Sequence, residues 1–172
     1  MNRLVAALVP HPRVAVGLGS ANLAGAVYGT IVATAVVLGL SKASASPARA
    51  FWILVGSGVF FWAAHVYAEL VAQRLHAHRP MTRADAARVM RREWPLFQAT
   101  FPLAVPLALG ALGVISPHGA RDLAAFVGVA TLALWGAAIA RREGCGAAGA
   151  IGAAAANAAV GLSLVALKLA LG

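Results

Sequence analysis

Two ionisable residues, His65 and Glu69, lie four positions apart inside a long apolar segment of this chain. Ionisable side chains are rare in the hydrocarbon region of a membrane, where they usually face a protein interior or a water-filled cavity. Gln73 and His76 continue the series, so all four side chains are expected on one face of a helix. Imidazole exchanges protons near neutral pH, and a carboxylate binds a proton or a cation. The stripe therefore predicts a proton or cation relay.

A purely structural role for His65 and Glu69 is the alternative, in which they only hydrogen-bond to neighbouring helices. Such contacts inside a membrane contribute about 0.6 kcal/mol on average, whereas a charge at the centre of a span costs about 2.5 to 3.5 kcal/mol. The difference favours a functional role. We expect Glu69 to carry the cation or proton, His65 to be its pH-responsive partner, and Gln73 with His76 to form the cytoplasmic mouth.

Whether the site takes a metal stays open, because the sequence has no second acid-rich or Cys-rich cluster to complete a ligand set. Enzyme motifs are also absent, since there is no GxSxG, HExxH or P-loop pattern. We therefore expect neither an enzyme nor a resident cofactor.

The composition indicates that lipid is the solvent of this chain. Of 172 residues, 61% are hydrophobic and 11% are charged, with a mean hydropathy of +0.82. That leaves too little polar surface to coat a soluble domain. The net charge of +9 lies in short segments without an aromatic-interleaved basic face, so we do not expect nucleic-acid binding.

The pattern predicts an all-α membrane protein, a single domain over residues 1–172. Apolar segments of about 20 residues cross the roughly 30 Å hydrocarbon core. Five transmembrane helices are expected, at residues 14–40, 50–75, 96–115, 123–140 and 147–171. A short cytoplasmic interfacial amphipathic helix is expected at 83–94, since Thr82 and Asp85 form a capping-box pattern and Trp94 with Pro95 marks a membrane boundary.

Basic residues set the expected orientation. With the N-terminus in the cytoplasm, ten basic residues lie inside: Arg3, Arg13, Arg74, Arg79, Arg83, Arg88, Arg91, Arg92, Arg141 and Arg142. Only Lys42, Arg49, Arg121 and Lys168 lie outside. We therefore expect a multi-pass protein of the plasma membrane, with its C-terminus outside by the positive-inside rule. Anionic headgroups are expected near Arg83, Arg88, Arg91 and Arg92, at about 1 kcal/mol for each cation.

Two local strings, GAVYGTIVAT at residues 25–34 and WAAHVYAELVAQRL at residues 62–75, resemble signatures of the vacuolar iron transporter family. The first is similar to that family's first-span GANDGIVTT signature, and the second is similar to its second-span MAAGEYVSxxSQRE signature. Residues 96–112 resemble the start of its third span, and 141–161 its last loop and span. The family's metal-site positions are largely not retained, because they fall at Tyr28, Trp62 and Val66.

The resemblance implies a five-span homodimer whose pathway lies between the first spans. Ala21, Gly25 and Gly29 form a small-residue track that permits close helix approach and would make that interface. The sequence thus predicts a transporter-like protein that moves a cation, with proton coupling, through His65 and Glu69. The alternative is a non-transporting scaffold or accessory subunit that binds another membrane protein through its small-residue helix faces.

Overall fold

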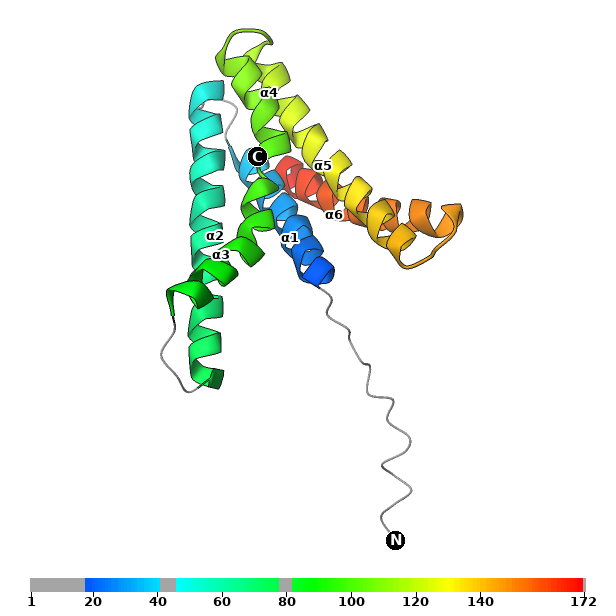
Figure 1. Cartoon of the computed structure of the whole chain (residues 1–172). Coiled ribbons are helices and arrows are strands. Elements are labelled where there is room, and N and C mark those ends of the chain that lie inside the picture. The colour runs from blue at the N-terminus through cyan, green and yellow to red at the C-terminus, as the bar shows by residue number, and fades with distance from the viewer. Residues whose placement is uncertain (1–17, 41–45, 78–81, 172) are drawn as a thin grey trace.

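The computed structural model describes residues 18–40, 46–77 and 82–171, without the side chains of residues 18–22, 77 and 171. This part of the chain forms six helices, α1 (Leu18–Gly39), α2 (Pro47–Ala77), α3 (Arg83–Gln98), α4 (Phe101–Ala111), α5 (Pro117–Arg142) and α6 (Ala147–Leu171). The described residues contain no strand, which confirms the all-helical class. In Figure 1, α4 and α5 are joined by a tight turn at the end of the molecule where α2 begins, and α3 crosses α2.

Among the described residues, three helices are long and apolar enough to cross a membrane, over Pro47–His76, Pro117–Arg142 and Ala147–Ala170. The pair α3 and α4 adds a fourth if it counts as one span bent by 52°. In α1, the apolar stretch Leu23–Gly39 is shorter. The fold is therefore that of a helical protein with three or four membrane-crossing candidates. Residues 14–17 of the first expected span lie outside the described residues, as do Arg3, Arg13, Lys42 and Arg79.

Two expected element boundaries between residues 83 and 115 are wrong. The helix expected at 83–94 continues through Pro95 to Gln98, and the span expected at 96–115 is broken at Ala99 and Thr100. Burial explains the continuation, because Val89 and Leu96 are both only 2% exposed and tie α3 to its neighbours.

The break has a separate cause. Pro102 has no amide hydrogen, so the carbonyl of Gln98 cannot receive the hydrogen bond that would continue the helix. The amide of Thr100 instead donates to the carbonyl oxygen of Phe97 at 3.0 Å. A new helix then starts at Phe101.

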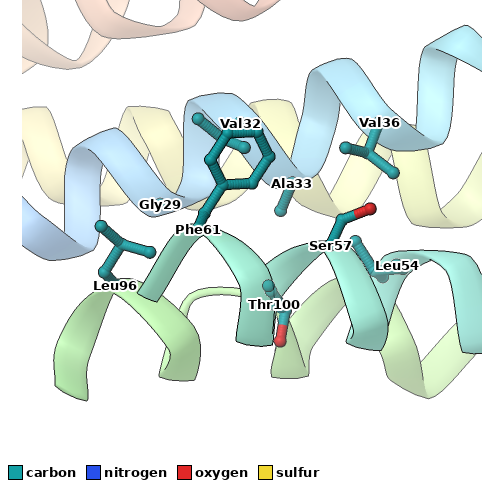
Figure 2. Close-up of a pocket in the computed structure, with 10 residues that line it drawn as sticks. Gly29, Val32, Ala33, Val36, Leu54, Ser57, Phe61, Leu96 and Thr100 are labelled. Atoms are coloured by element: carbon teal, nitrogen blue, oxygen red, sulfur yellow. The ribbon is translucent and has the colours of Figure 1, made fainter. Parts of the chain in front are cut away.

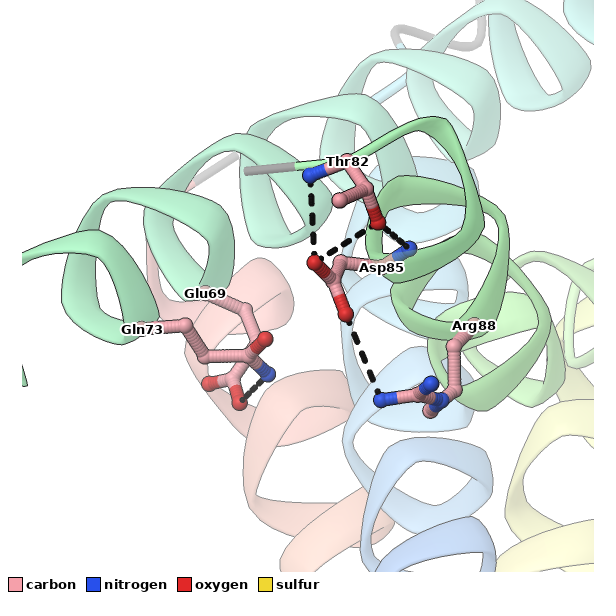
Figure 3. Close-up of polar contacts among 5 residues, drawn as sticks. All are labelled: Glu69, Gln73, Thr82, Asp85 and Arg88. Carbon is pink, nitrogen blue, oxygen red and sulfur yellow. Dashed lines mark hydrogen bonds and ion pairs between the residues drawn. The ribbon is translucent and has the colours of Figure 1, made fainter. Parts of the chain in front are cut away.

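The beginning of α3 has the capping box expected from the sequence. The Asp85 amide donates to the Thr82 hydroxyl at 3.2 Å, and the Thr82 amide donates to the Asp85 carboxylate at 3.1 Å. Two otherwise unpaired amides at the helix start are thereby satisfied. Arg88 lies 3.5 Å from the same carboxylate, as Figure 3 shows.

The apolar core lies where α1, α2, α4 and α5 meet. Its buried residues are Ala33, Val37, Ala50, Leu54, Leu103, Ala104, Leu107 and Ala124. Small residues bring the backbones close, because a Cβ on Gly110 would lie 2.5 Å from Ala120 Cβ and a Cβ on Gly128 would meet the Thr34 hydroxyl. Along α5 the buried residues recur every fourth position, at Ala120, Ala124, Gly128, Leu132, Gly136 and Ala140. Such small-residue ridges allow close packing of helices in a membrane.

Candidate functional site

The Glu69 carboxylate connects α2 to α3. Its Oε1 atom accepts a hydrogen bond from Gln73 Nε2 at 2.9 Å, one turn further along α2 (Figure 3). The same oxygen lies 3.2 Å from Nη1 of Arg92, which belongs to α3. Because residues four apart share a helix face, the Gln73 contact follows from the spacing. Nothing in the spacing indicated the Arg92 contact, which joins residues far apart in the sequence.

A second carboxylate reaches the same guanidinium. Glu93 Oε1 lies 3.9 Å from Arg92 Nε, so Arg92 has one carboxylate from α2 and one from α3 within ion-pair distance. We call Glu69, Arg92 and Glu93 the charge cluster. With two carboxylates and one guanidinium, its formal charge is −1. The side chains of Arg92 and Glu69 are 44% and 32% exposed, so solvated cations can reach the carboxylate.

His65 has different partners from those expected. Its Nδ1 donates to the carbonyl oxygen of Phe61 at 3.2 Å, and its ring lies 5.2 Å from the ring of Tyr28 on α1. Because a carbonyl can only accept, the Nδ1 position carries a proton in this contact. In the described part of the chain no hydrogen bond joins His65 to Glu69. The two residues are brought to one helix face but not into contact.

His76 is exposed near the end of α2. Its Nδ1 donates to the Ala72 carbonyl oxygen at 2.8 Å, within its own helix. It lies in the last turn of α2, about three turns beyond His65.

Aromatic side chains fix α3 against α2 just beyond the charge cluster. Trp62 donates from its indole Nε1 to the Met90 carbonyl oxygen at 3.3 Å, and its ring meets that of Trp94 edge-on at 5.7 Å. Trp94 packs on Phe97 and Phe97 on Phe101, at 5.1 and 5.2 Å. Edge-on aromatic pairs each contribute about 0.5 to 1.5 kcal/mol beyond burial. This row continues across the break into α4.

Gly29 is used in packing within the chain. A Cβ on Gly29 would lie 2.9 Å from Ala99 Cβ and 3.0 Å from Leu96 Cα, so only glycine lets α1 approach α3 this closely. A Cβ on Gly25 would come no nearer than 3.8 Å to the Leu96 amide nitrogen. The side chain of Ala21 lies outside the described part. The small-residue track was expected at a dimer interface, but at Gly29 it packs against α3 of the same chain. The homodimer stays a prediction.

The seam between α1, α2 and α3 is closed beyond His65. It holds a cavity of about 10 Å³ lined by residues such as Val32, Leu54, Phe61 and Leu96 (Figure 2). That volume is at the lower limit for one water molecule, which needs about 10 to 15 Å³ and several polar partners. The pocket in this seam therefore has room for at most about one water molecule.

A larger cleft that the sequence reading missed lies beside the break. It has a volume of about 410 Å³ between α1, α3, α4 and α5, and Pro95, Pro102, Trp135 and Arg142 are among its lining residues. The indole Nε1 of Trp135 is buried with no hydrogen-bond partner in the described part of the chain. Proline interruptions in an apolar segment are the signal that could have indicated this cleft, because broken spans commonly border transport sites.

No family model matches this chain, and neither curated proteins nor solved structures show a significant match. Among the described residues, no three His, Cys, Asp or Glu side chains gather closely enough to hold a metal ion. The function must therefore be argued from the charge cluster and the helices around it.

Proposed function

We propose that this chain is an integral membrane transporter that moves a cation, with a proton as the coupling ion, and that the charge cluster is its cytoplasmic-side binding site. The observation behind the proposal is the approach of two carboxylates, Glu69 and Glu93, to the single guanidinium of Arg92 at 3.2 and 3.9 Å. Their formal excess of one negative charge attracts a cation. Opposite unit charges 4 Å apart interact by about 1 kcal/mol in water and about 4 kcal/mol near a protein surface.

In this mechanism Arg92 occupies the place of the cargo in the empty state. An arriving cation competes with Arg92 for the Glu69 carboxylate, and Gln73 keeps that carboxylate in position through its 2.9 Å hydrogen bond. His65 supplies a proton acceptor one turn deeper in α2, at Nε2. His76 lies at the cytoplasmic mouth.

Movement of the cation past His65 requires α3 to separate from α1 and α2, since the pocket between these helices has a volume of only about 10 Å³. The break at Ala99 and Thr100 supports such a movement, because α3 and α4 already differ in direction by 52° there. Breaks of this kind allow one half of a span to move while the other stays packed.

The proposed topology has five spans, formed by α1, α2, the bent pair α3 and α4, α5, and α6. It includes a cytoplasmic N-terminus, an outside C-terminus and a plasma-membrane location. In its favour, Arg74, Arg141 and Arg142 lie in the last turns of α2 and α5, and the Arg-rich start of α3 follows α2 directly. The proposal includes the distant resemblance to the vacuolar iron transporter family. For that reason, Fe²⁺ and Mn²⁺ are among the cations to test.

Flux through purified protein in liposomes tests the proposal. Proton-sensitive and divalent-metal-sensitive dyes would report transport of a panel of cations under an imposed proton gradient. We expect Glu69→Gln to abolish flux and His65→Ala to remove its dependence on the proton gradient. Glu143→Gln is the matched control, because Glu143 is an exposed acid at the end of α5 outside the cluster. Wild-type protein that moves none of the cations, or full flux in Glu69→Gln protein, would refute the proposal.

An accessory membrane subunit is the second candidate. It is favoured by the same ion pair, because Arg92 already compensates Glu69 and a compensated carboxylate needs no cargo. Under this alternative, Glu69→Gln changes only stability, and changes on exposed helix faces disrupt assembly with a partner membrane protein. Co-purification of the wild-type chain from its native membrane, compared with variants at Gly56, would distinguish the two, since Gly56 has no atom within 4 Å of an added Cβ.

A further inference from the structure

A crevice unrelated to the charge cluster lies between α1, α5 and α6. It has a volume of about 490 Å³. Four of its lining residues are ionisable, and they come from the first turns of α5 and the last turn of α6: His118, Arg121, Asp122 and Lys168. The crevice thus joins two helix ends that are far apart in the sequence.

The rest of the crevice is apolar. Its walls include Val37, Ala125, Phe126, Val129, Leu162 and Val165. Arg121 and Val129 are eight residues apart on α5, which corresponds to about 12 Å along a helix. The basic side chains therefore lie at one end of the crevice, and the other end is apolar. A ligand that contacts both ends must be amphiphilic.

Charge decides between amphiphiles. Arg121 and Lys168 oppose a single carboxylate, Asp122, which leaves a formal charge of +1 when His118 is neutral. Lys168 is the only charged residue of α6, and Arg121 Nε donates to the Pro117 carbonyl oxygen at 3.2 Å, which orients its guanidinium at the helix start. Guanidinium and ammonium groups are the common protein ligands of phosphate esters.

We propose that this crevice binds an anionic phospholipid. The phosphodiester lies against Arg121 and Lys168, and an acyl chain lies along Phe126, Val129 and Leu162. A zwitterionic headgroup would bring its own cation into a site that is already positive. Inorganic phosphate would leave the apolar walls uncovered. The inference requires a membrane location but not transport activity, so it stands or falls separately from the charge cluster.

Native mass spectrometry of the purified full-length chain tests this site. The protein is titrated with phosphatidylglycerol and with phosphatidylcholine of identical acyl chains. We expect phosphatidylglycerol to bind about thirtyfold more tightly, which corresponds to about 1 kcal/mol for each of two cations. Replacing both cations, Arg121→Gln with Lys168→Gln, should reduce its affinity to that of phosphatidylcholine, and Lys168→Arg should retain the preference.

Arg49→Gln is the matched control, because it removes an exposed cation in the first turn of α2 that does not line the crevice. It should leave the preference unchanged. Ala125→Leu narrows the apolar slot without changing charge and should weaken the binding of both lipids. Equal affinity for the two lipids in the wild type, an equal loss of preference in Arg49→Gln, or inorganic phosphate binding as tightly as phosphatidylglycerol would each overturn the assignment.

Discussion

Among single side chains, Arg92 has the largest effect on the net charge around Glu69. It lies between carboxylates of α2 and α3, and its own side chain is 44% exposed. An ion pair that exposed contributes only about 0 to 1 kcal/mol to stability. Under the proposed function, its role is therefore to compete with the cation for the Glu69 carboxylate rather than to stabilise the fold.

Replacing Arg92 by Gln should strengthen cation binding. The change removes the competing guanidinium and takes the formal charge of the cluster from −1 to −2. For a divalent cation about 6 Å away in water, one more negative charge contributes roughly 1.4 kcal/mol, or about tenfold in affinity. Calorimetric titration of both proteins with Mn²⁺ in detergent measures this gain in affinity.

Arg91→Gln provides the control for this titration, because Arg91 is an exposed neighbour on α3 outside the cluster. A similar gain in both variants would mean that overall charge, and not competition at Glu69, controls cation affinity.

Element boundaries show what the sequence can predict. The helices expected at 50–75, 123–140 and 147–171 correspond to α2, α5 and α6, because polar and proline-containing linkers bound their apolar runs. Residues 83–115 were misjudged because two opposing effects act there. Packing of Val89 and Leu96 carries α3 past Pro95, while Pro102 breaks the following segment.

The candidate site could be predicted only in part, for a related reason. Helical periodicity places Gln73 beside Glu69 because both lie on α2. It contains no information on contacts between helices, so Arg92 and Tyr28 were missed as partners of Glu69 and His65. Those contacts depend on how closely α1 and α3 approach α2, which glycine positions determine.

Gly29 offers a test of that close approach. Exchanging glycine for alanine in the middle of a helix ordinarily stabilises it by about 0.5 to 1 kcal/mol. At Gly29 the added methyl group would meet Leu96 and Ala99, and overpacking of this kind costs about 1 to 3 kcal/mol. We therefore expect Gly29→Ala to lower the thermal unfolding midpoint in detergent.

The companion variant is Gly56→Ala on α2, where an added Cβ meets nothing within 4 Å. It should unfold at the wild-type temperature or above. An equal rise in both variants would contradict the packing described for α1 and α3.

For the whole molecule, the proposed topology places the turn between α5 and α6 in the cytoplasm and the turn between α4 and α5 outside. The chain contains a single cysteine, Cys145, and it is exposed in the first of these turns. It therefore serves as a native reporter of orientation.

A membrane-impermeant maleimide should label Cys145 in inside-out vesicles and not in intact cells. The reciprocal reporter is Cys145→Ala combined with Val114→Cys, at an exposed position in the turn between α4 and α5, which should be labelled in intact cells. Labelling of Cys145 from outside would show that the orientation is the reverse of the one proposed, with the charge cluster on the outer side of the membrane.

The bend between α3 and α4 also relates this protein to the thickness of its bilayer. With 16 and 11 residues, the two helices would extend about 40 Å if collinear. At 52°, their reach along α4 is about 31 Å, of which the Arg-rich start of α3 would lie among the headgroups rather than in the hydrocarbon core. A thicker bilayer then favours a straighter pair and a thinner one a sharper bend, at a fraction of a kcal/mol per Å. The acyl-chain length of the bilayer would thereby change the angle of α3, the helix that carries Arg92.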